Sequence, residues 1–158
     1  MLVRRNIYVL TFFALALISC NYKQLNSQQS SKALPLVGTW QLITGTVIAG
    51  GDTTVTNYDK NISFIKIIND THFSFLQHDV NKGKDSAAMF VAGGGKYDLK
   101  DSTYTEHLEY CSARNWEGND FVFKIRIKND TLIQSGFERV KGTKIDRINI
   151  EKYCRINK

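Results

Sequence analysis

The chain has 158 residues, of which 42% are hydrophobic and 23% are charged, and its formal net charge is +6. From Leu34 onward it is long enough for one domain with a hydrophobic core of its own. The lysines are spread over strands and turns and form no single block, so the charge distribution argues against a nucleic-acid-binding protein.

The first twenty residues have the features of an export signal. Arg4 and Arg5 precede the uncharged apolar run Ile7–Ile18. Such a run fits the core of a secretory signal and is shorter than the ~20 residues that span a bilayer. Leu17-Ile18-Ser19-Cys20 resembles a lipobox, which implies cleavage before Cys20 and acylation of that cysteine. We therefore expect residues 1–20 to be a lipoprotein signal peptide. The alternatives are a simple secretory signal and an uncleaved anchor.

Residues 21–35 are predicted to form a flexible tether. Asn21–Ala33 is rich in Ser, Gln and Asn and has too few apolar residues to form a core. The expected location is the cell envelope, where the protein is held on a bacterial membrane. The outer membrane is the expected one. Contact with that membrane is expected through the lipid on Cys20 only.

Residues 36–158 are predicted to be all-β. Most segments alternate apolar and polar residues, which is the period of a strand. The predicted strands are Val37–Ile48, Asn61–Ile68, Thr71–Gln77, Ala87–Ala92, Lys96–Leu99, Thr103–Cys111, Asp120–Lys128, Thr131–Phe137 and Ile145–Ile156. Short turns join them as sequential hairpins, which favours an up-and-down antiparallel β-barrel of about eight strands over a sandwich.

Three features between the strands are predicted from glycine, asparagine and aspartate. Asn69-Asp70 and Asn129-Asp130 are expected to form tight turns with positive φ. Gly93-Gly94-Gly95 is expected to be a flexible lead-in or a β-bulge, because the Lys-Ser/Thr of a phosphate-binding loop does not follow it. Asp79–Ser86 is polar and is expected to be a loop.

Gly38-Thr39-Trp40, at the start of the first strand, resembles the Gly-x-Trp signature of lipocalins. The resemblance implies that Trp40 closes one end of a calycin-type barrel and that an arginine of the last strand, best matched by Arg155, packs over it as a structural cap. Four segments resemble a lipocalin-like domain found in lipoproteins of Bacteroidetes-type bacteria, a group largely of unknown function. They are Val37–Leu42, Lys66–Phe75, Gly94–Leu99 followed by Tyr104–His107, and Phe123–Gly136.

The candidate ligand-binding residues lie where strands of a small barrel would face its lumen. Tyr104 and Glu106 share a face, and burying Glu106 alone is unfavourable, so it requires a partner. Tyr97 and Arg126 are the candidate partners, and His72 could line the mouth or the lumen. The alternatives are a purely structural polar cluster around Glu106, a surface position for Arg126 and a surface histidine beside a turn.

Cys111 and Cys154 remain once Cys20 is assigned to the lipid. In an oxidising compartment they could form a disulfide, or they could be two free thiols packed as small apolar side chains. No histidine pair has the i, i+2 spacing of a strand-based metal site, so no metal is expected. No catalytic residues or cofactor are expected either, and Glu106 and His107 would point to opposite faces of one strand. An enzyme is therefore not expected.

Two functions follow from these predictions. The first is binding of a small, partly apolar molecule in the lumen of a membrane-tethered barrel. The second is a filled barrel whose outer face and loops bind another envelope protein, as an interaction or inhibitor module. The expected partner is thus a small molecule or an envelope protein, and not a nucleic acid.

Overall fold

The computed structural model describes residues 34–58 and 60–156. By its contacts the chain divides into two units, Met1–Ser30 and Ser31–Lys158. The predicted signal peptide, the lipid-attachment residue Cys20 and most of the predicted tether lie outside the described residues. The described residues belong to the second unit.

Nine strands and one short 3-10 helix make up the described part of the chain. They are β1 (Gly38–Ala49), β2 (Asp52–Asn57), β3 (Ile62–Ile68), β4 (His72–Asp79), β5 (Phe90–Lys100), β6 (Thr103–Cys111), η1 (Arg114–Trp116), β7 (Asn119–Lys128), β8 (Thr131–Arg139) and β9 (Asp146–Arg155). No helix within these described residues has the length and apolar character needed to cross a membrane.

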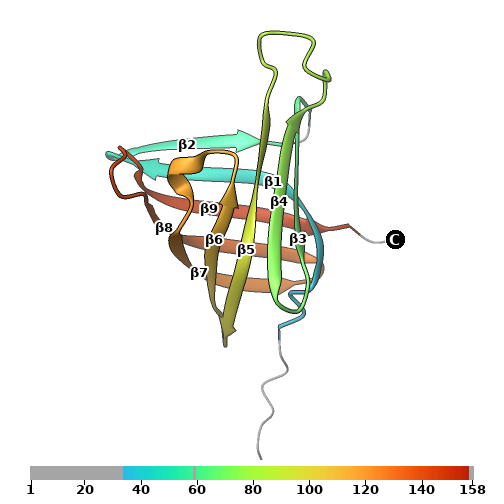
Figure 1. Ribbon diagram of the computed structural model, residues 1–158. Coiled ribbons are helices and arrows are strands. Elements are labelled where there is room, and N and C mark those ends of the chain that lie inside the picture. Colours follow the sequence, from blue (N-terminus) through green and yellow to red (C-terminus); the bar gives the residue numbers. More distant parts are fainter. Residues whose placement is uncertain (1–33, 59, 157–158) are drawn as a thin grey trace, which may run out of the picture. The chain divides into compact units, whose positions relative to one another are not determined.

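The strands form one antiparallel sheet that closes on itself (Figure 1). Each strand from β3 to β9 pairs with its neighbour in the chain, and β9 pairs with β1 to complete the circle. β1 and β3–β9 are the eight strands of this barrel, and β2 pairs with β1 alone. The predicted up-and-down antiparallel barrel is confirmed. Closure leaves the eight barrel strands without an open sheet edge of the kind that promotes aggregation.

A bulge in β1 explains why this strand has two partners on one edge. The register with β9 shifts between Leu42 and Thr44. Before the bulge β1 pairs with β3, and after it with β2. The extra residue of a bulge bends the strand and increases its twist. β2 was not predicted, because its sequence DTTVTN is largely exposed and has no apolar alternation to mark it.

The hydrophobic core lies inside the barrel, where alternate residues of each strand meet. β7 follows the predicted alternation, with Phe121, Phe123 and Ile125 buried and the residues between them exposed. The buried apolar residues are Leu36, Trp40, Leu42, Phe64, Ile68, Phe73, Tyr104, Leu108, Cys111, Phe121, Phe123, Ile125, Leu132, Val140 and Tyr153. They fill one end of the barrel more completely than the other.

The filled end is sealed by Trp40 and Arg155, which the structure brings together. Trp40 is fully buried, and its indole nitrogen donates to the carbonyl of Leu36 at 2.9 Å. The Arg155 guanidinium lies 4.0 Å from the centre of the indole ring and donates to the carbonyl of Val37 at 2.8 Å. Gly38 has φ +148°, and a Cβ there would collide with the Arg155 guanidinium. The glycine of Gly-x-Trp therefore makes room for the arginine.

The three glycines lie inside a strand and do not interrupt it. β5 runs through Gly93-Gly94-Gly95, where two separate strands were predicted, and the predicted bulge lies between Gly94 and Gly95. A Cβ on Gly93 would collide with the ring of Phe75, and one on Gly95 would collide with the carbonyl of His107. Glycine is therefore required here by the close approach of the neighbouring strands.

Candidate functional site

The barrel contains a cavity of about 350 Å³ that extends from its middle to the end opposite Trp40. This volume lies within the range of ~300–1,000 Å³ that is typical of ligand pockets. We call this end the mouth. It is formed by the turn from β1 to β2, the loop from β4 to β5, η1, and the loop from β8 to β9.

The cavity has an apolar side and a polar side. The apolar side comes mainly from β3, β4, β6, β7 and η1, with the side chains of Phe64, Phe75, Leu108, Trp116, Phe121 and Phe123. The polar side comes mainly from β8 and β9, with Gln134, Glu138, Arg147, Asn149 and Glu151. Lys66 of β3 and Glu106 of β6 also reach the cavity. A lining of this kind suits a molecule that is partly apolar and carries a few polar groups.

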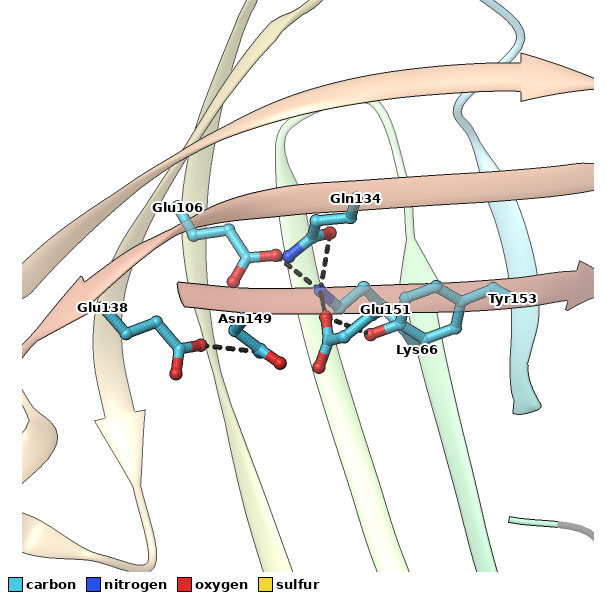
Figure 2. Close-up of polar contacts among 7 residues, drawn as sticks. All are labelled: Lys66, Glu106, Gln134, Glu138, Asn149, Glu151 and Tyr153. Atoms are coloured by element: carbon cyan, nitrogen blue, oxygen red, sulfur yellow. Dashed lines mark hydrogen bonds and ion pairs between the residues drawn. The ribbon is translucent and has the colours of Figure 1, made fainter. Parts of the chain in front are cut away.

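Lys66 is the centre of the polar groups (Figure 2). Its ammonium donates to Oε1 of Glu106 at 2.7 Å and to Oε1 of Gln134 at 3.1 Å. Oε2 of Glu151 lies 4.0 Å from the same ammonium and accepts a hydrogen bond from the Tyr153 hydroxyl at 2.8 Å. The side chains of Lys66 and Glu106 are only 3% and 8% exposed, so their ion pair is buried.

Two carboxylates thus share one ammonium. Burial by itself would lower the pKa of Lys66, but the charges of Glu106 and Glu151 outweigh it and raise that pKa. Burial raises the pKa of Glu106, and the Lys66 ammonium opposes this only in part. Lys66 therefore stays charged, and burial disfavours the ionised form of Glu106.

A second ion pair lies nearer to the mouth. Arg147 donates from Nε to Oε2 of Glu138 at 2.7 Å, and Asn149 donates to Oε1 of the same carboxylate at 2.8 Å. The guanidinium of Arg147 also lies 5.5 Å from the centre of the Trp116 ring. Both oxygens of Glu138 are therefore occupied, and the pair is neutral as a whole.

Tyr104 and Tyr97 lie between the polar groups around Lys66 and the sealed end. The Tyr104 hydroxyl is buried, and none of the residues that the structure describes forms a hydrogen bond with it. Burial, and then the charge of Glu106, raises its pKa, so it is a neutral phenol. The Tyr97 ring packs 5.2 Å from that of Tyr104, while its hydroxyl donates to the carbonyl of Asn69 at 2.8 Å. Tyr97 is thus a neighbour of the cluster and not the partner of Glu106.

Two of the predicted ligand-binding residues lie outside the lumen. Arg126 is exposed on the outer face of β7, on the opposite side from Phe123 and Ile125, so the structure does not bring it to Glu106. His72 is exposed at the start of β4, where its ring contacts the hydroxyl of Thr71 at 2.7 Å. Both positions agree with the surface alternatives.

The two cysteines of the barrel are free thiols, so the disulfide that was considered does not form. Cys111 is buried, whereas Cys154 is exposed on β9 beside the buried Tyr153. Their side chains lie on opposite faces of the barrel wall. Within residues 34–58 and 60–156, no group of three or more His, Cys, Asp or Glu side chains is arranged to hold a metal ion.

Sequence reasoning placed Glu106 inside the barrel but missed Lys66, Gln134 and Glu138. A signal for Lys66 was present, because it alternates with Phe64 and Ile68, which are both buried. Glu151 shares its face with Tyr153, and this could have placed it in the lumen as well.

The fold and the cavity define a closed, up-and-down β-barrel with an internal space that reaches one end. The chain belongs to the family described as Domain of unknown function (DUF4488), whose model matches residues 35–158. No curated protein matches the chain. Among solved structures it is similar to an uncharacterized protein from Bacteroides eggerthii, with 13% sequence identity and a TM-score of 0.44. The match covers 76% of this chain and 98% of that one.

Proposed function

We propose that this protein is a lipocalin-like lipoprotein of the bacterial cell envelope that binds a small, partly apolar molecule in the lumen of its barrel. It is tethered to the outer membrane by the lipid on Cys20. It acts as a binding protein and not as an enzyme. The observation that carries the proposal is the cavity of about 350 Å³, with aromatic side chains on one side and hydrogen-bonding groups on the other.

The contacts of Glu106 support binding over catalysis. Glu106 faces the lumen, whereas His107, the next residue, is on the outer face and contacts Asp98 and Asp120 at 2.9 and 2.7 Å. An acid and a base on opposite sides of the barrel wall cannot act on one substrate. Glu106 accepts a hydrogen bond from the Lys66 ammonium at 2.7 Å, which holds the carboxylate in place.

The test is native mass spectrometry of the protein purified from the envelope of its own host. We expect an added mass that leaves on denaturation. Glu106→Leu would lose it, while Glu109→Leu, on the exposed face of the same strand, would keep it. A mass equal to that of the bare chain in every preparation would contradict the proposal.

A second candidate function, binding of another envelope protein, is favoured by one observation on the outer face. Phe137 and Ile148 are exposed and paired across β8 and β9. Val122 of β7, also exposed, directly precedes Phe123, whose partner in β8 is Gly136, the residue before Phe137. Contiguous exposed apolar side chains are typical of interaction surfaces. A bare chain that co-purifies with one protein, and releases it on Phe137→Asp, would favour this function.

A further inference from the structure

We propose that the lumen selects a molecule with an apolar body and a protonated amine as its polar end. This inference rests on the proposed function, because it names the class of ligand for the same cavity. It follows from the balance of charges and hydrogen-bond donors inside the barrel.

The formal charges of the groups around the cavity do not balance. Its lining includes three carboxylates and two cations, namely Glu106, Glu138, Glu151, Lys66 and Arg147. Arg147 and Glu138 form their own pair at 2.7 Å. Lys66 is then left with two carboxylates, at 2.7 and 4.0 Å. In formal charges, the inner part of the lumen thus has two carboxylates for one ammonium, and a second cation there would favour the ionised form of Glu106, whose pKa is raised by burial.

The ammonium of Lys66 is not free to receive an anionic ligand. It already donates to Glu106 and Gln134 and lies near Glu151. A carboxylate or phosphate placed beside it would also meet the like charges of Glu106 and Glu151. An anionic end group is therefore disfavoured.

Acceptors, in contrast, are in surplus. Oε1 of Glu106 accepts from the Lys66 ammonium, and the buried Tyr104 hydroxyl is a further donor beside the same carboxylate. Oε1 of Glu151 has no hydrogen bond to any residue in the described part of the chain, while the Tyr153 hydroxyl donates to Oε2. An ammonium group supplies three donors and one positive charge. It would donate to Oε1 of Glu151 and neutralise the excess charge beside Glu106.

The opposite side of the cavity has aromatic rings against which the apolar body of the ligand can pack. Phe64 and Phe75 stack with their ring centres 5.9 Å apart, and the rings of Trp116 and Phe121 lie 5.7 Å apart. These four side chains line the cavity. An alkyl or aryl group packed against them leaves the amine to reach the carboxylates across the lumen.

The test uses three probes that share one chain and differ in the end group: octylamine, 1-octanol and octanoate. They are titrated into residues 31–158, which form a compact unit of their own, by isothermal calorimetry. We expect octylamine to bind at least about tenfold more tightly than 1-octanol, and octanoate to bind most weakly. Equal or tighter binding of 1-octanol or octanoate would overturn the amine assignment and leave the lumen as a binding site. Binding of none of the three would overturn the proposed function as well.

Glu151→Gln separates charge from shape at the same position. It keeps the side-chain volume and leaves the pair of Lys66 and Glu106 intact. We expect it to weaken octylamine about tenfold and to leave 1-octanol unchanged. Glu109→Gln, on the outer face, should change neither. If Glu151→Gln does not fold, as judged by thermal unfolding, Glu106→Gln serves in its place. Equal losses for octylamine and 1-octanol would show a structural role and contradict the inference.

Discussion

Lys66 illustrates how one residue determines the character of the lumen. Lysine is seldom fully buried in proteins unless it is paired. Here its aliphatic stem lies in a strand whose neighbouring inward residues are Phe64 and Ile68, and its ammonium lies between two carboxylates. A buried ion pair of this kind contributes little net stability, but the loss of one partner leaves the other charge buried alone.

We therefore expect Lys66→Met to lower the free energy of unfolding by about 3–5 kcal/mol, because Glu106 is left without its cation. Lys66→Met combined with Glu106→Leu should recover part of this loss, since Glu151, whose side chain is 15% exposed, is then the remaining carboxylate without its cation. Urea unfolding at neutral pH measures both variants.

Lys124→Met is the matched control, because this lysine is exposed on β7 and its ammonium donates to the hydroxyl of Thr103 at 2.6 Å. Its effect should stay within about 0.5 kcal/mol. A loss of less than ~1 kcal/mol for Lys66→Met would mean that Glu106 is accommodated without its partner.

At this scale the sequence predicted the inward direction of Glu106 but not its partner. Alternation along β6 is clear, because polar and apolar residues take opposite sides there. β3 has apolar residues on both faces, with Ile62, Ile65, Ile67 and Ile68 around Lys66. The alternation of residues in β3 could not by itself decide which face of the strand points into the lumen. A lysine is ordinarily expected to face solvent.

Two hairpins with the same Asn-Asp-Thr sequence show how far elements could be predicted. Asn129 and Asp130 both have positive φ, as expected, and join β7 to β8 as a two-residue turn. Neither Asn69 nor Asp70 has a positive φ. The Asn69 side chain instead accepts from the backbone nitrogens of Thr71 and His72, at 2.9 and 2.7 Å. The prediction of one shared turn form was wrong, because local sequence permits both forms and the register of each strand pair selects one.

The loop that joins β4 to β5 is held by Asp79, the last residue of β4. Its two carboxylate oxygens accept from the backbone nitrogens of Gly83 and Met89, at 2.8 and 3.0 Å. These hydrogen bonds lower the pKa of Asp79. Their contribution to stability is present above the usual pKa of an aspartate, about 3.9, and is lost as the pH falls through the lowered value.

We expect Asp79→Asn to loosen this loop, because the amide nitrogen cannot accept the second backbone hydrogen bond. Hydrogen exchange at Gly83 and Met89 should become faster at neutral pH, while the amides of β7 keep their protection. As the pH falls through the lowered pKa of Asp79, the exchange rates of the wild-type loop should approach those of the variant. Asp101→Asn, in the hairpin from β5 to β6, is the control. Unchanged exchange at Gly83 would contradict the role given to Asp79.

The whole barrel could be predicted because its topology is a series of local steps. Each strand from β3 to β9 pairs with the next along the chain, so turn signals and alternation define most of the sheet. Closure through β1 and β9 is the exception, as these strands are far apart in the sequence. The cavity could not be predicted, because its size depends on how side chains from many strands pack together.

The proposed tether gives a prediction for the full chain. Wild-type protein expressed in a bacterium that processes lipoproteins should fractionate with membranes and incorporate labelled palmitate. Cys20→Ser should do neither, because the acylated thiol is absent. The unchanged cysteines Cys111 and Cys154 are the internal control for the label. Palmitate incorporation that persists in Cys20→Ser would contradict the assignment.

The sealed end also determines where a label or tag can be attached without blocking the mouth. Leu36 and Val37 are bound to Trp40 and Arg155, and the nitrogen of Ile156 donates to the carbonyl of Thr39 at 2.8 Å. Both ends of the described chain therefore leave the barrel on the side away from the mouth. A fluorophore, affinity tag or sensor surface attached at either end keeps clear of the path by which a ligand enters. An insertion in the Val80–Met89 loop would stand at the entrance.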